Sequence, residues 1–312
     1  MDHQSRIDLL QPSAWRRVAP LAGDASQRRY SRCLGADGRT AILVRYPGLS
    51  SSELGRDLEV LDWCRSRGIV VPDILAHDLE AGLALLEDLG DVDAEHALED
   101  ASPSDRPHLL QRLLRPLEVL AEIDLEELPA WNSPLDEERM RWELAGFELW
   151  FLRHLRGVAP SPALGRWLDG LALAVGGHPR RICHRDYHFN NLMVASDGSV
   201  GIIDIQDILI GPDTYDAVSL LFERSAERLL TSAEQGGLLA AWADRTGARP
   251  GWRPRSDAVR LQRGLKVLGS FARFVIAGRR EYAPWLKELS LRMAPRLEAA
   301  GAPPEITAIL VD

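Results

Sequence analysis

The segment ICHRDYHFNNLMVASDGSVGIIDIQD, residues 182–207, constrains this chain more than any other part of its sequence. Two apolar, β-rich runs flank an Asp-Gly pair, which is a strong signal for a β-hairpin turn. Because a hairpin returns the chain to its starting point, Asp204 is predicted to lie near Asn191, thirteen positions earlier. Asp186 comes just before the hairpin, so three polar side chains are expected in one region.

Phosphoryl transfer requires such a set of side chains. One carboxylate orients the acceptor hydroxyl and takes its proton, and hard oxygen ligands hold Mg²⁺ on the nucleotide phosphates. The run HRDYHFNN, residues 184–191, matches the kinase catalytic loop H-R-D-x-x-x-x-N. We therefore predict Asp186 as the catalytic carboxylate and Asn191 and Asp204 as magnesium ligands. Residues 204–206 read D-I-Q instead of D-F-G, a departure that resembles small-molecule kinases more than protein kinases.

Two other interpretations of this segment compete with the kinase one. Its Asp and His side chains could cap turns in an ordinary structural loop, although the complete spacing between strand-like runs argues against that. Cys183, His184 and His188 could bind zinc, but the sequence has no second Cys or His cluster at ligand spacing. His184 is better explained as a buried side chain that braces the loop backbone.

Hydrophobic patterning predicts strands near the beginning of the chain and helices after them. The runs TAILVRY (40–46) and GLALLED (82–88) predict strands, and residues 51–67 have the apolar spacing of a helix. Residues 104–178 and 216–312 are predicted to be helical, on either side of a strand-rich stretch.

This order of elements predicts an α+β protein with two lobes. Residues 1–90 are expected to form a small N-terminal lobe with an antiparallel sheet that binds the nucleotide. Residues 91–312 are expected to form a larger, mainly helical C-terminal lobe that carries catalysis and substrate binding.

Charge and composition exclude several classes of protein. The formal net charge is −9, which argues against general nucleic-acid binding. The N-terminus lacks the apolar stretch of a signal peptide, and no run approaches the ~18 apolar residues of a membrane helix. Cys33, Cys64 and Cys183 lie far apart, as expected for reduced thiols. We expect a cytoplasmic protein with no nucleic-acid, membrane or obligate protein partner.

Lysine is rare in this chain. Lys266 and Lys287 are the only lysines among 37 lysine and arginine residues. Any phosphate contact in the first 265 residues must therefore come from an arginine, a backbone N–H or a hydroxyl group.

Several segments, in this order along the chain, resemble the aminoglycoside-phosphotransferase and choline-kinase superfamily. More narrowly, they are similar to bacterial N-acetylmuramate/N-acetylglucosamine anomeric kinases. The resemblance implies a protein-kinase-like two-lobe fold, ATP and Mg²⁺ as cofactors, and phosphorylation of the anomeric hydroxyl of a hexose in cell-wall sugar recycling. The segments are GDASQRRYSR (23–32), LLEDLGD (85–91), ELAGFELWFL (143–152), HRDYHFNNLM (184–193), IDIQD (203–207), GPDTYDAVSLL (211–221) and LQRGLKVLGSFARF (261–274).

The resemblance also implies contacts to ATP. A turn near residue 23 would face the phosphates, and backbone groups of an interlobe hinge would bind adenine. Arg45 stands where kinases carry the strand lysine, and it is either a phosphate contact or a solvent-facing charge that pairs with Asp57 or Glu59. The predicted ATP-binding residues are Gly23, Asp24, Ser26, Arg28, Arg45, Glu87 and Leu89.

The remaining predictions concern the acceptor. Gln206 and Asp207 are implied to face it, beside Asp186. Glu143 lies on an apolar helix, where a carboxylate needs a partner, either sugar hydroxyls or an arginine. Lys266 is predicted to bind the substrate, although it or Arg263 could instead pair with an acid. His184 and Asp216 are expected to support the catalytic loop.

Two alternative functions remain open at the level of the sequence. One is a kinase for another alcohol, such as an aminoglycoside, choline or homoserine. The other is a nucleotide-binding pseudokinase that acts as an interaction module. The missing strand lysine favours the pseudokinase, and the intact Asp186, Asn191 and Asp204 oppose it.

Overall fold

The computed structural model describes residues 15–21, 28–46, 51–223 and 225–311. The chain divides into two compact units. Unit 1 contains the described residues up to Val119 together with Phe189–Ile208, and unit 2 contains Leu120–His188 and the described residues from Leu209 onward. The predicted order, an antiparallel sheet first and mostly helices afterwards, is confirmed.

The two compact units are not the two predicted lobes, because unit 1 also includes residues 189–208. The lobe boundary at residue 90 stays a prediction. Residues 189–208 belong to unit 1 because they pair with the chain just after the sheet. Val194 N–H donates to Val92 O at 2.8 Å, and Asp93 forms an antiparallel bridge with Met193.

Unit 1 is built on a five-stranded antiparallel sheet with the strand order β1-β2-β3-β5-β4. Strands β3 and β5 confirm the two strands predicted from the sequence. Gly38 has φ +81° in the turn between β2 and β3, a conformation that favours glycine. The strands are β1 (Trp15–Leu21), β2 (Arg29–Gly35), β3 (Thr40–Arg45), β4 (Ile74–Asp78) and β5 (Leu83–Glu87).

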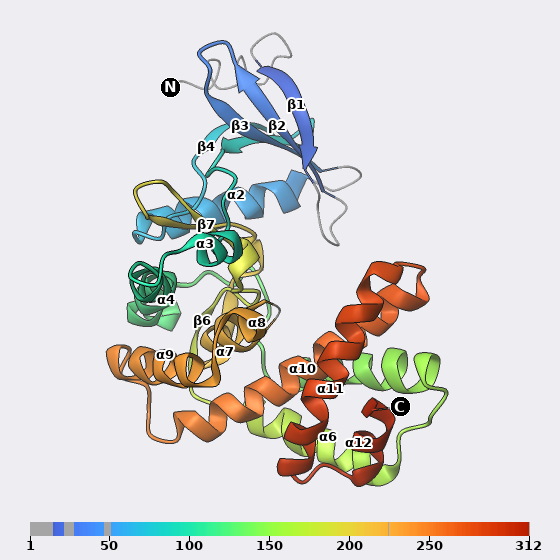
Figure 1. The fold of residues 1–312 in the computed structure, drawn as a ribbon. Coiled ribbons are helices and arrows are strands. Elements are labelled where there is room, and N and C mark those ends of the chain that lie inside the picture. Colours follow the sequence, from blue (N-terminus) through green and yellow to red (C-terminus); the bar gives the residue numbers. More distant parts are fainter. Residues whose placement is uncertain (1–14, 22–27, 47–50, 224, 312) are drawn as a thin grey trace. The chain divides into compact units, whose positions relative to one another are not determined.

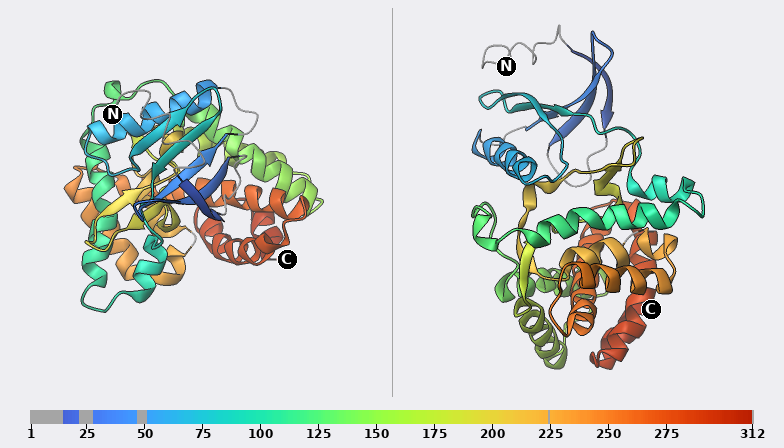
Figure 2. Two further views of the ribbon diagram at one scale, coloured as in Figure 1. Left: turned by 90° about the horizontal axis from the view of Figure 1, so that it is seen from above. Right: turned by 90° about the vertical axis from the view of Figure 1, so that its left-hand side faces the viewer.

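Helix α2 (Ser51–Ser66) covers one face of this sheet, as Figure 1 and both views of Figure 2 show. Leu54 and Leu58 of the helix pack in one cluster with Val44, Tyr46 and Ala84 of the sheet side. A separate cluster on the sheet contains Ala41, Ala76 and Leu85. The two clusters follow from the alternation of side chains along each strand.

The rest of unit 1 contains the predicted hairpin. Strand β7 (Leu192–Val194) pairs antiparallel with β8 (Val200–Ile202), with Gly198 at φ +79° in the turn. Short 3₁₀ turns, η3 (Phe189–Asn191) and η4 (Ile205–Asp207), flank the hairpin. Helices α3 (Ala94–Asp100) and α4 (Arg106–Glu122) precede it in the chain.

Unit 2 is mainly helical. Its core contains buried residues such as Leu144, Phe147, Phe151, Leu265 and Leu268. The elements are η1 (Leu125–Glu127), α5 (Glu137–Gly146), the π-helix η2 (Phe147–Leu155), α6 (Pro162–Gly176), β6 (Arg180–Cys183) paired antiparallel with β9 (Leu209–Pro212), α7 (Tyr215–Phe222), α8 (Ala226–Leu229), α9 (Ser232–Arg245), α10 (Trp252–Ile276), η5 (Arg280–Tyr282), α11 (Ala283–Ala299) and α12 (Pro304–Val311).

Helix α10 lies at the centre of unit 2 and packs against η2 (Figure 1). Gly269 is a point of close approach between them, since a Cβ atom placed there would lie 2.7 Å from Phe147 N. Throughout the described ranges, every helix is too short or too polar to span a membrane. The three cysteines are buried and unbonded to one another.

Candidate active site

The catalytic-loop motif follows strand β6 in unit 2, and Asp216 of α7 holds its backbone. Asp216 accepts hydrogen bonds from His184 N at 2.6 Å and from Arg185 N at 2.9 Å. Arg185 has φ +80°, an uncommon conformation for a residue with a side chain. Burial raises the pKa of Asp216, even though His184 and the two N–H donors favour the carboxylate. Two hydrogen bonds donated to a buried carboxylate thus stabilise the strained turn before Asp186.

Asp186 is surrounded by positive charge. Lys266 Nζ lies 3.8 Å from Asp186 Oδ1, and Arg263 Nη2 lies 3.9 Å from the same oxygen. Burial alone would raise the pKa of Asp186, but Lys266, Arg263, Arg185 and His188 outweigh it and hold the pKa well below its usual range. Asp186 is therefore a carboxylate at neutral pH.

Arg263 is fixed within unit 2. Its side chain is 1% exposed, and it donates to Arg185 O at 2.7 Å, Ser219 Oγ at 2.9 Å and both carboxylate oxygens of Glu223. Its guanidinium also stacks 4.2 Å from the centre of the Tyr215 ring. Of the two cations predicted either to meet a substrate or to pair with an acid, Arg263 pairs with Glu223, and Lys266 lies beside Asp186 with a side chain 20% exposed.

Glu143 of α5 has protein partners for its carboxylate. Its side chain is 1% exposed and accepts a hydrogen bond from Gln262 Nε2 at 2.8 Å and a longer one from Arg185 Nη2 at 3.4 Å. Of the two partners predicted for a carboxylate on this apolar helix, the structure provides the arginine. Glu143 thereby connects α5 and α10 to the residue before Asp186.

The two predicted metal ligands belong to unit 1, and the hairpin brings them together there. Ile203 N donates to Asn191 O at 3.0 Å. Because Asp204 directly follows Ile203, this hydrogen bond brings Asp204 close to Asn191. Asp204 is exposed and has left-handed backbone angles, φ 61° and ψ 34°. Gln206 Nε2 donates to Asp204 Oδ1 at 2.8 Å, so the side chain predicted to face the acceptor contacts the metal-ligand candidate. Asp207 ends the adjoining turn η4.

An amide oxygen and an exposed carboxylate suit Mg²⁺, which is usually held by one or two protein side chains plus substrate phosphates. In the described residues, no group of three or more His, Cys, Asp and Glu side chains forms a metal cage. Cys183 is buried, and burial raises the pKa of its thiol well above the ordinary value, which opposes the thiolate that zinc requires. The residues present therefore fit a magnesium ion better than zinc.

The predicted nucleotide contacts also lie in unit 1. Gly23, Asp24 and Ser26 lie outside the described residues. Arg45 ends β3 and is exposed. The Glu87 N–H already donates to Asp73 O at 2.8 Å, so a contact with adenine there would use the Glu87 carbonyl.

Asp57 of α2, which the sequence suggested as an ion-pair partner of Arg45, interacts with other side chains. Its carboxylate accepts from Tyr46 OH at 2.9 Å and forms ion pairs with Arg56 at 3.1 Å and Arg28 at 3.5 Å. Sequence reasoning missed the pair of Arg28 and Asp57. The available signal was that Arg28 lies two positions before Tyr30, on the same side of β2. Leu89, the second adenine-contact candidate, is half-buried beside Gly201.

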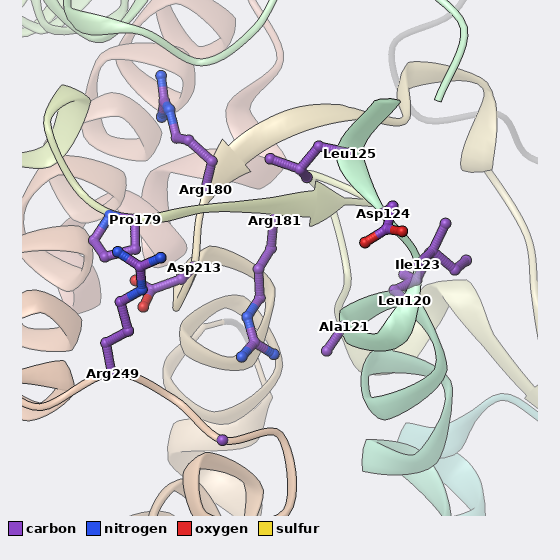
Figure 3. Close-up of a pocket in the computed structure, with 11 residues that line it drawn as sticks. Leu120, Ala121, Ile123, Asp124, Leu125, Pro179, Arg180, Arg181, Asp213 and Arg249 are labelled. Atoms are coloured by element: carbon purple, nitrogen blue, oxygen red, sulfur yellow. The ribbon is translucent and has the colours of Figure 1, made fainter. Parts of the chain in front are cut away.

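A pocket of about 350 Å³ in unit 2 is separate from these residues (Figure 3). Arg181 and Arg180 extend to opposite sides of β6, and Arg180 Nη1 donates to Leu135 O at 2.8 Å. Asp213 lies at the pocket and forms an ion pair with Arg255 at 2.6 Å. None of the predicted catalytic or binding residues is in the lining, which consists of Leu120, Ala121, Ile123, Asp124, Leu125, Pro179, Arg180, Arg181, Asp213, Gly247 and Arg249.

Comparison with known proteins places the chain among phosphotransferases. A protein named N-acetylmuramate/N-acetylglucosamine kinase from Pseudomonas aeruginosa is 34% identical over 268 residues, covering 82% of this chain and 76% of that protein. A protein of the same name from Neisseria meningitidis is 28% identical over 313 residues, covering 93% and 89%. The solved structure of choline kinase LicA from Streptococcus pneumoniae shares the fold, with a TM-score of 0.65, 15% identity, and coverage of 96% of this chain and 100% of that one.

The model of the phosphotransferase enzyme family (APH) matches residues 17–257, which include the catalytic-loop motif and the hairpin. The family match confirms the superfamily indicated by the sequence motifs. The chain belongs to the phosphotransferase enzyme family.

Proposed function

We propose that this protein transfers the γ-phosphoryl group of ATP to the anomeric hydroxyl of N-acetylmuramate or N-acetylglucosamine. The observation that carries the proposal is the 34% identity to a relative with that substrate pair in its name, spread over 82% of the chain. ATP and Mg²⁺ as cofactors and a cytoplasmic location belong to the same proposal.

In this proposal Asp186 orients the acceptor hydroxyl and accepts its proton. Phosphoryl transfer passes through a loose transition state, in which orientation of the nucleophile matters more than basicity. The low pKa of Asp186 therefore fits its role, because the carboxylate is ionised and ready to accept a hydrogen bond. The anomeric hydroxyl is the most acidic hydroxyl of a reducing sugar, so a weak base suffices for its late deprotonation.

Asn191 and Asp204 would hold Mg²⁺, which neutralises charge on the nucleotide phosphates when it is bound. Gln206 contacts Asp204 directly, so we assign it the role of positioning that carboxylate. Asp207, on the same turn, is the residue of this segment that we propose to face the acceptor.

Lys266 is the proposed cation at the acceptor. It lies beside Asp186, and its side chain is partly exposed, so it can approach a substrate anion such as the lactyl carboxylate of N-acetylmuramate. Glu143 acts indirectly in this scheme. Its buried carboxylate positions Arg185 and Gln262 and does not need to contact the sugar.

The product distinguishes the proposed reaction from other kinase reactions. Incubation of the purified protein with ATP, Mg²⁺ and each sugar, followed by phosphorus and proton NMR, should give a phosphate coupled to H1. A methyl glycoside of N-acetylglucosamine lacks the free anomeric hydroxyl and should not be turned over. Phosphate on O6, or turnover of the methyl glycoside, would refute the anomeric assignment while leaving a sugar kinase in place.

A further inference from the structure

Arg45, at the end of β3, does not lie on the sheet face where a kinase lysine would lie, which is the face covered by the following helix. In protein kinases the β3 lysine contacts the nucleotide phosphates and pairs with a glutamate on the following helix. Here Val44 and Tyr46 pack in the cluster that contains Leu54 and Leu58 of α2. Because side chains alternate along a strand, Arg45 between them extends to the other face, and it is exposed.

Arg28 instead lies on the face covered by α2. It comes two residues before Tyr30, which packs against the α2 cluster. Arg28 Nη1 lies 3.5 Å from Asp57 Oδ2, and the two side chains are only 16% and 7% exposed. The pair thus has the arrangement of a kinase lysine and its helix glutamate, with the charge supplied by the residue just before β2 instead of by β3.

Two further contacts fix the acid of this pair. Tyr46 OH donates to Asp57 Oδ2 at 2.9 Å, and Arg56 Nη2 lies 3.1 Å from Asp57 Oδ1. The Arg28 guanidinium also lies 5.4 Å from the centre of the Tyr46 ring. A guanidinium has five N–H donors in a rigid plane, so it can contact a carboxylate and a phosphate at the same time.

The metal-ligand candidate Asp204 precedes a turn that packs against the helix carrying Asp57. Helix α2 contacts the turn η4 that follows Asp204. Burial raises the pKa of Tyr30, and the negative charge of Asp204 adds to this effect while Arg28 opposes it. Nucleotide phosphates that carry a magnesium ion also need positive charge from the protein.

We propose that Arg28, oriented by Asp57 on α2, binds the nucleotide phosphates in place of the missing strand lysine, and that Arg45 does not. The inference rests on the proposed function, because it requires a nucleotide as phosphoryl donor. Arg28 acts as a binding residue here, and Asp57 acts as a positioning residue through it.

Nucleotide binding in the absence of acceptor tests the inference. The affinities of the full-length protein for ATP·Mg²⁺ and for adenosine would be measured by calorimetry in the wild type, Arg28→Ala and Arg45→Ala. Arg28→Ala should weaken ATP binding about 10-fold to 100-fold, the range for a lost charge-assisted hydrogen bond. Its affinity for adenosine should change less than about 2-fold, because adenosine has no phosphate. Arg45→Ala is the matched control and should bind both as the wild type does.

Additional variants separate binding from folding. Arg28→Gln keeps a polar side chain and should show the same selective loss if Arg28→Ala unfolds, which thermal melts would reveal. Asp57→Asn keeps the shape of the side chain but removes its charge, so its affinity for ATP should fall less than that of Arg28→Ala. Arg28→Lys keeps a positive charge at position 28, so its affinity for ATP should lie between those of Arg28→Ala and the wild type. Wild-type ATP affinity in Arg28→Ala, or an equal loss in Arg45→Ala, would overturn the inference alone. Failure of the wild-type protein to bind ATP would overturn the inference together with the proposed function.

Discussion

Lys266 Nζ lies 3.8 Å from Asp186 Oδ1, so one of only two lysines in the chain is beside the carboxylate that we propose as catalytic. Arg263, three residues earlier on α10, approaches the same oxygen but is committed to Glu223. The spacing of three places both cations on one face of the helix. Lys266 is therefore the cation near Asp186 that substitution can remove with the least damage to the core.

The first prediction concerns pH. The pKa of Asp186 is held below its usual value, so Asp186 stays ionised as the pH falls until that lowered pKa is reached. Lys266→Met removes one stabilising charge and should raise the pKa of Asp186. The acid-side decline of kcat/KM should then move to higher pH, and kcat at neutral pH should fall about 10-fold or more.

Profiles of kcat/KM from neutral pH down to the lowest pH at which both proteins remain folded test this prediction. Lys287→Met is the matched control, because Lys287 is the other lysine and is exposed on α11. Lys266→Arg should retain the wild-type acid limb. An unchanged acid limb in Lys266→Met would show that the ion pair does not control the charge of Asp186.

The second prediction concerns the carboxylate itself. Asp186→Asn preserves the shape of the side chain but loses the proton acceptor and the charge, so kcat should fall about 10²-fold or more. The thermal midpoint should remain near that of the wild type. Asp257→Asn, an exposed change on α10, should leave kcat unaltered. Nearly full turnover by Asp186→Asn would require another residue to orient the acceptor.

The third prediction concerns magnesium. Asp204→Asn and Asn191→Ala should each raise the Mg²⁺ concentration needed for half-maximal ADP release, because each removes an oxygen ligand or its charge. Asparagine tolerates left-handed backbone angles, so Asp204→Asn changes the ligand with little added strain at φ 61°. Titration of activity with Mg²⁺, alongside thermal melts, measures the effect. A Mg²⁺ dependence identical to that of the wild type would contradict the assignment of that residue.

The fourth prediction separates support of the loop from general stability. Asp216→Ala leaves the N–H groups of His184 and Arg185 without their buried acceptor, which costs about 1–3 kcal/mol for each group. Both the thermal midpoint and kcat should fall, while the KM for ATP should change little.

Asp213→Asn is the comparison for Asp216, since both carboxylates are 5% exposed. Asp213 pairs with Arg255, whereas the described acceptor of the loop N–H groups is Asp216, so loss of the Asp213 charge should lower the thermal midpoint and leave kcat largely intact. If both variants lower kcat equally, general destabilisation of the protein would explain the effect, and Asp216 would have no specific role in the loop.

The fifth prediction concerns packing in unit 2. Gly269→Ala would place a Cβ atom 2.7 Å from Phe147 N, against backbone that cannot move aside easily. Overpacking of this kind costs about 1–3 kcal/mol of unfolding free energy. At Gly264 on the same helix the nearest atoms to a new Cβ belong to the flexible end of the Met293 side chain, so Gly264→Ala should cost less. Urea unfolding of both variants measures the difference, and a larger loss for Gly264→Ala would contradict this account.

Local sequence determined several features of this protein. The Asp-Gly turn between β-rich runs specified the hairpin from Leu192 to Ile202, and the hairpin brings Asp204 to Asn191. Continuous apolar, β-rich runs specified strands β3 and β5. Hydrogen bonding and side-chain alternation over a few residues suffice for these features, so they can be predicted without tertiary contacts.

Tertiary structure decided which charged side chains meet. Glu143 is bonded to Gln262, 119 positions away, and Arg263 is paired with Glu223, 40 positions away. Arg28, not Arg45, reaches Asp57, because packing of α2 against one face of the sheet leaves Arg45 on the other. A buried charge needs a partner, but the sequence does not reveal which distant segment provides it. That choice depends on how the whole chain packs.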